Sequence, residues 1–382
     1  MTKKGRPFTL CTIAVLIGLL LGATLNFASS QSSGTQVNGI INSNRAWTKT
    51  GSPYNLTGNI LVDYGVTLIV ESGVTVNLNG YYIMVNGTLQ AIGGTSGPTN
   101  FVGGEIIFTQ NSTDWNEDTG NGCIIQNCIL TSTITANNSP KLSNNVCNNA
   151  ISIQTTTGMP LVAGNFLMGG LVMVGNGIIT NNTVIGQGID VFGANLIVSH
   201  NIVTECSTGI RVSTSLYNPS WHWPNLTTVI ENNLITNNEK GITLDAWQMF
   251  VPCNPFVINN TITNNTIGLY LTHLFSNNAP TLLLNNIYEN HNYNIKNDVP
   301  DNNVDAPYNW WGTTNTTIID QLIYDYYDDF TLGKVNYMPT LSAPNFEVFP
   351  MIIPEIATCL ITVLFLTLIC AVMVTLKRKL EC

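Results

Sequence analysis

Four side chains in the middle of the chain have the types that acid–base chemistry on a sugar would need. When the repeats "GIDV", "GIRV", "GITL" and "GLYL" are aligned on their glycines, Asp190 and Arg211 fall in one column, and Asp245 and His273 lie just beyond it. Two carboxylates that flank a bond are the minimum for glycoside hydrolysis. The same residues also make ordinary ion pairs on a protein surface, which contribute little. Both interpretations stay open from the sequence.

Aromatic residues stand in the insertions beside these repeats. The insert "SLYNPSWHWPN" carries Tyr217, Trp221 and Trp223, and "AWQMFVPCNP" carries Trp247. Aromatic rings next to carboxylates suit a sugar-binding cleft, because rings stack on C–H faces while polar groups bind hydroxyls. We therefore take these four residues as candidate ligand contacts. The alternative is that they pack the insertions onto the body of the protein.

A repeat positions these residues. Each unit is anchored by an asparagine before an apolar pair, and the anchors are Asn127, Asn145, Asn165, Asn182, Asn201, Asn233, Asn260 and Asn286. Successive anchors differ by 18, 20, 17, 19, 32, 27 and 26 residues, and the insertions explain the three longer intervals. A period of roughly twenty residues is typical of solenoids.

The residues within each unit alternate between apolar and polar, which predicts strands with one buried face. The turns are too short for crossover helices, so strands of successive units must stack in parallel, coil upon coil. This arrangement is an all-β parallel β-helix. Asparagines that recur at one turn predict a ladder of side-chain hydrogen bonds between coils. We expect this ladder in the column that holds Asn144, Asn181, Asn232, Asn259 and Asn285. Gly164 and His200 interrupt this column.

Both ends of the chain have the composition of targeting segments. Basic residues and an apolar run precede Ser30, as in a secretory signal peptide. The uncharged run from Ile356 to Leu376 is long enough to cross a bilayer and is followed by Lys-Arg-Lys, which predicts an outside body and a cytoplasmic tail. The expected divisions are signal peptide 1–30, N-terminal cap and first coils 31–120, Asn-rich coils 121–300, C-terminal cap 301–345, linker 346–355, transmembrane helix 356–376 and tail 377–382.

The composition excludes some partners. The net charge is −9 and only 9% of residues are charged, so the chain lacks the basic surface that nucleic acids require. Five cysteines lie in the expected outside part, at 123, 128, 147, 206 and 253, and none has the spacing of a zinc site. We expect buried thiols or one or two disulfides, and no metal site.

Three features carry a resemblance to a known family: the opening "SPYNLTGNILVDYGVTLIVESGVTV", the Asn-rich coils and the closing "NWWGTTN" followed by "IID". The chain resembles right-handed parallel β-helix proteins of the pectin-lyase-like fold, of the membrane-anchored surface type found in archaea. Its coils are also similar to those of NosD-like periplasmic proteins. The resemblance covers roughly residues 45–345. Polysaccharide lyases and hydrolases of this fold use acidic residues on one face, sometimes with Ca²⁺ and an Arg or Lys base.

We therefore expect a cell-surface protein that binds a glycan or an envelope partner in an adhesive or structural role. The first alternative is a polysaccharide lyase or glycoside hydrolase, and the second is an accessory role in metal or cofactor maturation, against which the lack of a Met/His/Cys cluster counts. No cofactor is expected, with Ca²⁺ as the one open alternative. The sequons on expected loops, at Asn225 and Asn315, are candidate glycosylation sites.

Overall fold

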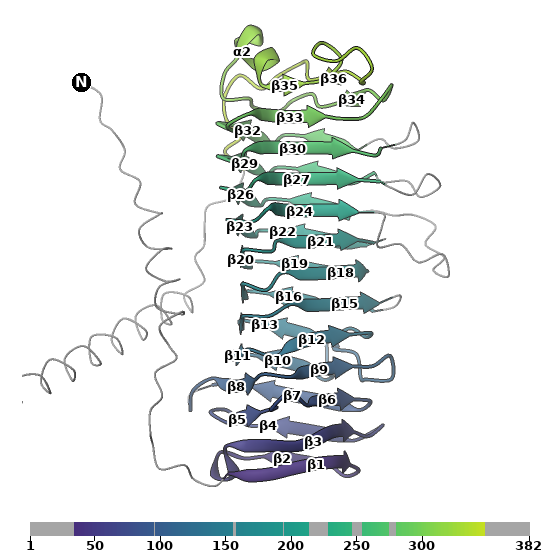
Figure 1. Cartoon of the computed structure of the whole chain (residues 1–382), viewed down its shortest axis with the longest axis vertical. Helices are drawn as coiled ribbons and strands as arrows, with labels where there is room; N and C mark the ends of the chain where they lie inside the picture. The colour runs from purple at the N-terminus through teal and green to yellow at the C-terminus, as the bar shows by residue number, and fades with distance from the viewer. Residues whose placement is uncertain are drawn as a thin grey trace, which may run out of the picture. The chain divides into compact units, whose positions relative to one another are not determined.

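The structure is a computed structural model that describes residues 34–94, 96–155, 158–193, 195–213, 228–246, 254–274 and 280–347. In this part of the chain nearly all regular structure is strand, and the strands stack in parallel, coil upon coil (Figure 1). The prediction of an all-β solenoid of parallel strands is confirmed. None of the helices in these residues is long and apolar enough to cross a membrane. The predicted signal peptide 1–30 and transmembrane run 356–376 lie outside the described residues.

Each complete coil places one strand in each of three parallel columns, which we call faces 1, 2 and 3. Face 1 is a sheet by itself. Its strands are β2 (Arg45–Trp47), β4 (Thr67–Val70), β7 (Thr88–Ile92), β10 (Ile124–Gln126), β13 (Lys141–Ser143), β16 (Leu161–Ala163), β19 (Gly177–Thr180), β22 (Leu196–Ser199), β25 (Thr228–Glu231), β28 (Phe256–Ile258) and β31 (Thr281–Leu283).

Faces 2 and 3 join into one sheet, because the long first strands β1 (Thr35–Ile41) and β3 (Tyr54–Val62) run across both. The other strands of face 2 are β5 (Thr75–Asn77), β8 (Thr99–Val102), β11 (Cys128–Leu130), β14 (Val146–Cys147), β17 (Phe166–Leu167), β20 (Thr183–Ile185), β23 (Ile202–Thr204), β26 (Leu234–Thr236), β29 (Thr261–Thr263) and β32 (Asn286–Tyr288). Those of face 3 are β6 (Tyr82–Val85), β9 (Glu105–Phe108), β12 (Thr133–Ala136), β15 (Ile151–Thr155), β18 (Leu171–Gly175), β21 (Ile189–Phe192), β24 (Thr208–Ser213), β27 (Lys240–Asp245), β30 (Ile267–Thr272), β33 (Tyr293–Asn297) and β35 (Ile323–Tyr324).

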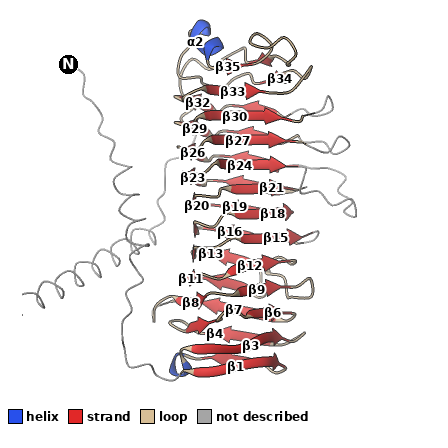
Figure 2. Ribbon diagram, in the orientation of Figure 1, coloured by secondary structure: helices blue, strands red, loops and turns tan. Residues whose placement is uncertain are grey.

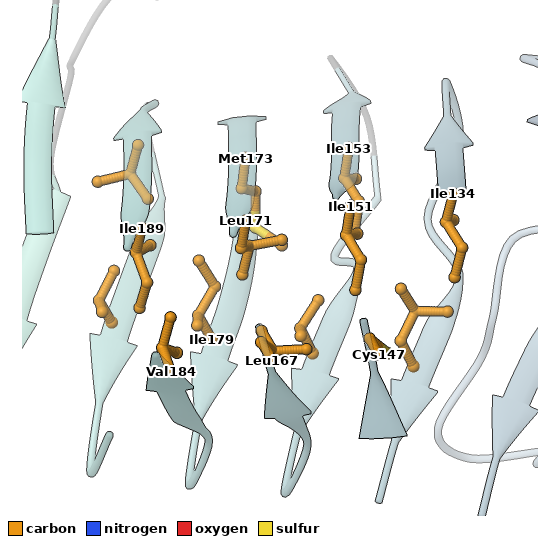
Figure 3. Packing of buried hydrophobic residues seen from close by; sticks show 14 of the residues in the cluster. Ile134, Cys147, Ile151, Ile153, Leu167, Leu171, Met173, Ile179, Val184 and Ile189 are labelled. Carbon is orange, nitrogen blue, oxygen red and sulfur yellow. The ribbon is translucent and has the colours of Figure 1, made fainter. Parts of the chain in front are cut away.

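Alternation along each strand builds the core. In β15, Ile151 and Ile153 are buried while Ser152 between them is exposed. The inward residues of neighbouring coils pack on one another, as Ile153 does beside Met173 in register (Figure 3). Full burial of one such side chain stabilises the fold by about 1.5–3 kcal/mol. The outward residues of the same strands are free to carry other chemistry.

The corner between faces 1 and 2 is where the structure displaces the predicted ladder by one residue. Asn144, Asn181, Asn232, Asn259 and His200 have φ between 53° and 56°, so they turn the corner in the left-handed conformation that Asn tolerates. The next residue is buried and forms the ladder. His200 therefore belongs to the bend, at the same position as these asparagines.

The ladder runs through eight coils. Each Oδ1 accepts the backbone N–H and an Nδ2–H of the preceding member at 2.8–3.0 Å. Its members are Asn145, Asn165, Asn182, Asn201, Asn233, Asn260, Asn285 and Asn309. Asn285 is thus the one residue of our predicted column that belongs to the ladder, and the last repeat is anchored there and not at Asn286.

A second ladder, which the sequence did not lead us to expect, lies at the corner between faces 2 and 3. It runs from Cys206 through Asn238 and Asn265 to Asn290 with the same pattern of bonds. A cysteine stands before the first asparagine of each ladder, because Cys128 likewise donates its N–H to Asn145. Neither cysteine has a preceding asparagine amide to bind, so a thiol that donates to a nearby carbonyl is sufficient there.

Helix α2 (Thr316–Gln321) and the pair β34 (Val304–Asp305) and β36 (Val335–Asn336) lie beyond the last coil (Figure 2). Trp311 is buried there against Tyr337, with ring centroids 5.9 Å apart. The helix ends at Gln321, and the chain returns at Ile323 to pair with β33. In the first coil, the short 3-10 helix η1 (Lys49–Gly51) connects β2 to β3 and buries no residue.

The described cysteines are buried free thiols: Cys123, Cys128, Cys147 and Cys206. Burial raises the pKa of the Cys128 thiol to about 12, and it raises the others too. We expect iodoacetamide at pH 8 to leave these four thiols unmodified in the folded chain and to label them in urea, because the thiolate reacts and an unfolded cysteine has a pKa of about 8.5. Peptide mass spectrometry reads each site, and rapid labelling of Cys147 in the native chain would contradict the buried placement.

Candidate functional site

Asp190 and Arg211 are neighbours on face 3. They are paired in register between β21 and β24, and both point outward. The guanidinium donates twice to the carboxylate, with Nε–Oδ1 at 3.1 Å and Nη2–Oδ2 at 2.6 Å. The hydrogen bonds with Asp190 raise the pKa of Arg211. The pair is a two-pronged ion pair in which both carboxylate oxygens are occupied.

Asp245 and His273 form a second pair one to two coils further on. His273 Nδ1 lies 3.1 Å from Asp245 Oδ1. The Asp245 side chain is only 10% exposed, whereas His273 is 41% exposed. The Asp245 charge also raises the pKa of Arg211, so the two pairs share one electrostatic environment. The structure thus brings the four predicted residues to one part of face 3.

The column continues through Thr243 and Tyr270, which the glycine alignment already placed in it, to two residues that the sequence analysis missed. Thr243, Tyr270, Lys296 and Tyr324 follow Arg211 in register on successive strands. Lys296 Nζ lies 5.6 Å from the ring centroid of Tyr270 and 5.2 Å from that of Tyr324. Extending the glycine alignment by two coils would have found the last two residues.

Two further residues bracket Tyr270. Lys240 places its Nζ 4.6 Å from the Tyr270 ring centroid. Asp298 accepts the Tyr270 hydroxyl proton at 2.9 Å and pairs with Lys296 Nζ at 2.7 Å. Burial, followed by the bond to Asp298, raises the pKa of Tyr270. We call the whole set the polar strip: Asp190, Arg211, Lys240, Thr243, Asp245, Tyr270, His273, Lys296, Asp298 and Tyr324.

The polar strip occupies only the later coils of face 3. In the earlier coils the same outward column holds uncharged residues, in register from Leu61 to Val172. The change occurs at Asp190, which pairs with Val172. This outward column of face 3 is therefore uncharged in its earlier half and charged and aromatic in its later half.

Two basic groups of the strip, Arg211 and Lys296, are poor candidates for catalytic bases. A general base must lose its proton near the working pH. Burial opposes the charge of Lys296, but the bond with Asp298 outweighs it, and the pKa of Lys296 is raised. The pKa of Arg211 is raised as well. Both side chains stay cationic, so proton abstraction of the lyase type has no base among them.

Within the described residues no group of three or more His, Cys, Asp or Glu side chains is placed to hold a metal ion. In the acidic run at 325–329, the Asp325 and Asp329 carboxylates accept hydrogen bonds from nearby backbone and hydroxyl groups. Asp325 accepts the backbone N–H groups of Tyr327 and Val335. Asp329 accepts the backbone N–H and the hydroxyl proton of Thr331. These bonds hold the turns of the cap.

The remaining predicted residues divide into two groups. Tyr217, Trp221, Trp223, Trp247 and the sequon Asn225 lie outside the described residues. Their segments connect β24 to β25 and β27 to β28, and so leave face 3 at Ser213 and Asp245, which are in register. The other sequon, Asn315, is exposed and caps α2, where its side chain accepts the N–H of Thr317 at 3.1 Å.

Comparison with protein-family models, with curated proteins and with solved structures found no match to this chain. The assignment of a role therefore depends on the residues of the polar strip.

Proposed function

We propose that the chain is a cell-surface binding protein whose polar strip holds a polysaccharide without cleaving it. In this proposal the coils are those of a right-handed, pectin-lyase-like β-helix, residues 1–30 direct secretion, and residues 356–376 anchor the protein in the membrane. The proposal places the solenoid outside the cell, where glycans and envelope proteins are the available partners.

The observation that supports it is the concentration of charge and aromatic rings in one strip. Only 9% of the chain is charged, yet the outward column of face 3 collects Asp190, Arg211, Lys296 and their neighbours on adjacent coils. A solenoid needs no such residues for its core. Parallel strands about 4.8 Å apart present them as a regular row, which suits an extended polymer.

The groups of the strip match sugar chemistry. Carboxylates accept hydrogen bonds from hydroxyls, and ammonium groups donate to hydroxyl or carboxylate oxygens. Lys240 contacts the Tyr270 ring but has no ion pair to a carboxylate among the described residues, so its charge is available to a ligand. The Thr243 hydroxyl is buried in the same row without a hydrogen-bond partner among those residues.

The enzymatic alternative depends on Asp245 and His273. A buried carboxylate beside a half-exposed imidazole is an arrangement that can move a proton. Neither other carboxylate of the strip is unpaired, because Arg211 binds both oxygens of Asp190, and Tyr270 and Lys296 bind Oδ2 of Asp298. We therefore favour binding over hydrolysis.

The test incubates the purified full-length chain with uronate-rich and neutral polysaccharides, with and without Ca²⁺, and measures retention and new chain ends. Retention without new chain ends is expected. Tyr270→Ala should weaken retention about tenfold, because it removes the aromatic ring and with it the contact that positions Lys240. Ser152→Ala, an outward change on the earlier half of face 3, should leave it unchanged.

Two results would overturn this proposal. New chain ends that disappear in Asp245→Ala would identify a hydrolase or lyase. If no polysaccharide in the panel is retained or cleaved, glycan binding would be contradicted, and an envelope protein would be the next partner to test.

A further inference from the structure

Beyond the polar strip, the outer surface of face 1 carries an apolar stripe. Leu161, Ile178, Ile197, Val229 and Phe256 point outward from five successive strands and are paired in register. Phe256 is 41% exposed, and the other four are half-buried. An apolar row on adjacent coils needs a covering group to be kept from water.

The end of the described chain returns to the edge of this stripe. After the cap, Leu341 donates its N–H to Asn309 O at 3.0 Å. Four residues later, Asn345 is bound one to two coils lower, at the corner between faces 1 and 2. Its N–H donates to Asn286 Oδ1 at 2.7 Å, and its Nδ2 donates to Leu284 O at 2.8 Å and Asn259 Oδ1 at 3.1 Å. The chain therefore runs back along the coils and is fixed beside β28 and β31.

The sequence soon after Asn345 is apolar. Residues 348–354, which lie outside the described residues, read Val-Phe-Pro-Met-Ile-Ile-Pro. They contain no charge, and the two prolines favour an extended backbone in which the remaining N–H groups bind water. An apolar segment next to an apolar stripe loses exposed surface if the two meet.

The lengths agree. Phe256 and Leu161 are four coil steps apart, which at about 4.8 Å per step is about 19 Å. Seven extended residues reach about 22–23 Å. The segment can therefore cover the stripe from end to end, starting at the corner where Asn345 is bound.

We propose that residues 348–354 are a strap that docks on the apolar stripe of face 1, and not a free spacer. Docking would bring the apolar run that begins at Ile356 close to the middle coils. If that run crosses the membrane, face 1 lies toward the bilayer and the polar strip on face 3 is presented on another side. The proposal does not depend on what the polar strip binds.

The test uses the full-length chain with the photoreactive residue p-benzoylphenylalanine in place of Phe349. Irradiation is expected to give crosslinks within one chain to peptides of β19, β22 or β25. The same residue in place of Leu341 is the positive control, because the structure places Leu341 next to Asn309. Mass spectrometry identifies the crosslinked peptides.

A matched pair of variants checks the stripe. Val229→Asp should reduce the crosslink yield about tenfold or more, because docking would bury the new charge. Ile107→Asp, an outward half-buried position on face 3, should not change it. Crosslinks between two chains, adducts with lipid, no product at position 349, or equal yields in the two variants would each overturn the proposal.

Discussion

Replacing Asn233 with alanine is expected to lower the free energy of unfolding by about 3–5 kcal/mol. Its Oδ1 accepts the backbone N–H and the side-chain Nδ2–H of Asn201, and its own Nδ2 donates to Val198 O, Glu231 O and Asn260 Oδ1. Alanine would remove the side-chain acceptor of the buried Asn201 N–H and the donor to Val198 O, while Asn260 Oδ1 keeps the backbone N–H of residue 233. Each unsatisfied buried group costs about 1–3 kcal/mol, and some relaxation of the corner recovers part of the loss.

Urea denaturation and hydrogen exchange of the Asn201 amide would measure the loss. The matched control is Asn232→Gly, at the adjacent position with φ of 53°, which should change stability by no more than about 0.5 kcal/mol. Asn233→Asp keeps the shape and one acceptor but removes the donor and puts a charge against Asn260 Oδ1, so it should be at least as damaging as alanine at pH 7. Equal stability of Asn233→Ala and the control would contradict the ladder's role.

Gly241→Ala is expected to cost about 3 kcal/mol. A Cβ at this position would lie 2.5 Å from the carbonyl oxygen of Gly268 in the next coil and 3.1 Å from Asn265 Nδ2 in the second ladder. The first contact is with backbone, so it is relieved only if the two coils move apart. That movement would also stretch the ladder bond between Asn238 and Asn265, now 2.9 Å.

The control for this glycine is Gly94→Ala. There the nearest atom to a new Cβ is Ser72 Oγ at 3.6 Å, an ordinary contact. Its stability should stay within about 0.5 kcal/mol of the parent chain. Thermal unfolding measured by circular dichroism compares the two variants. A Gly241→Ala chain as stable as Gly94→Ala would show that the coils have room that the structure does not give them.

Gly241 also shows that a glycine repeated in every coil can have a cause other than a left-handed turn. A glycine repeated at the edge of each strand is typical of a turn that needs a left-handed backbone. Gly209, Gly241 and Gly268 are not in that conformation, since their φ values are not positive. They are glycines because successive coils approach too closely there for any Cβ. The distance between neighbouring coils at these glycines cannot be predicted from the sequence of a single repeat.

The asparagine pairs likewise do not reveal from the sequence which of their two residues forms the ladder. In "NN" either residue can bend the chain and either can bond to the next coil, since both have the same side chain. The repeat predicts that a ladder exists, but the structure places it one residue later, at Asn233 and not at Asn232. Only the direction of the side chain relative to the corner distinguishes them.

The class of fold could be predicted from the sequence, because alternation and a period of about twenty residues follow from local backbone geometry. The alignment of Asp190 with Arg211 could be predicted too, since parallel strands repeat the same register in each coil. The contacts between coils could not be predicted from the sequence. They include the lysine next to the Tyr270 ring, the close approach of successive coils at the glycines, and the hydrogen bond between Asn345 and Asn286. These contacts join residues 25 or more positions apart, and their geometry depends on where whole coils come to rest on one another.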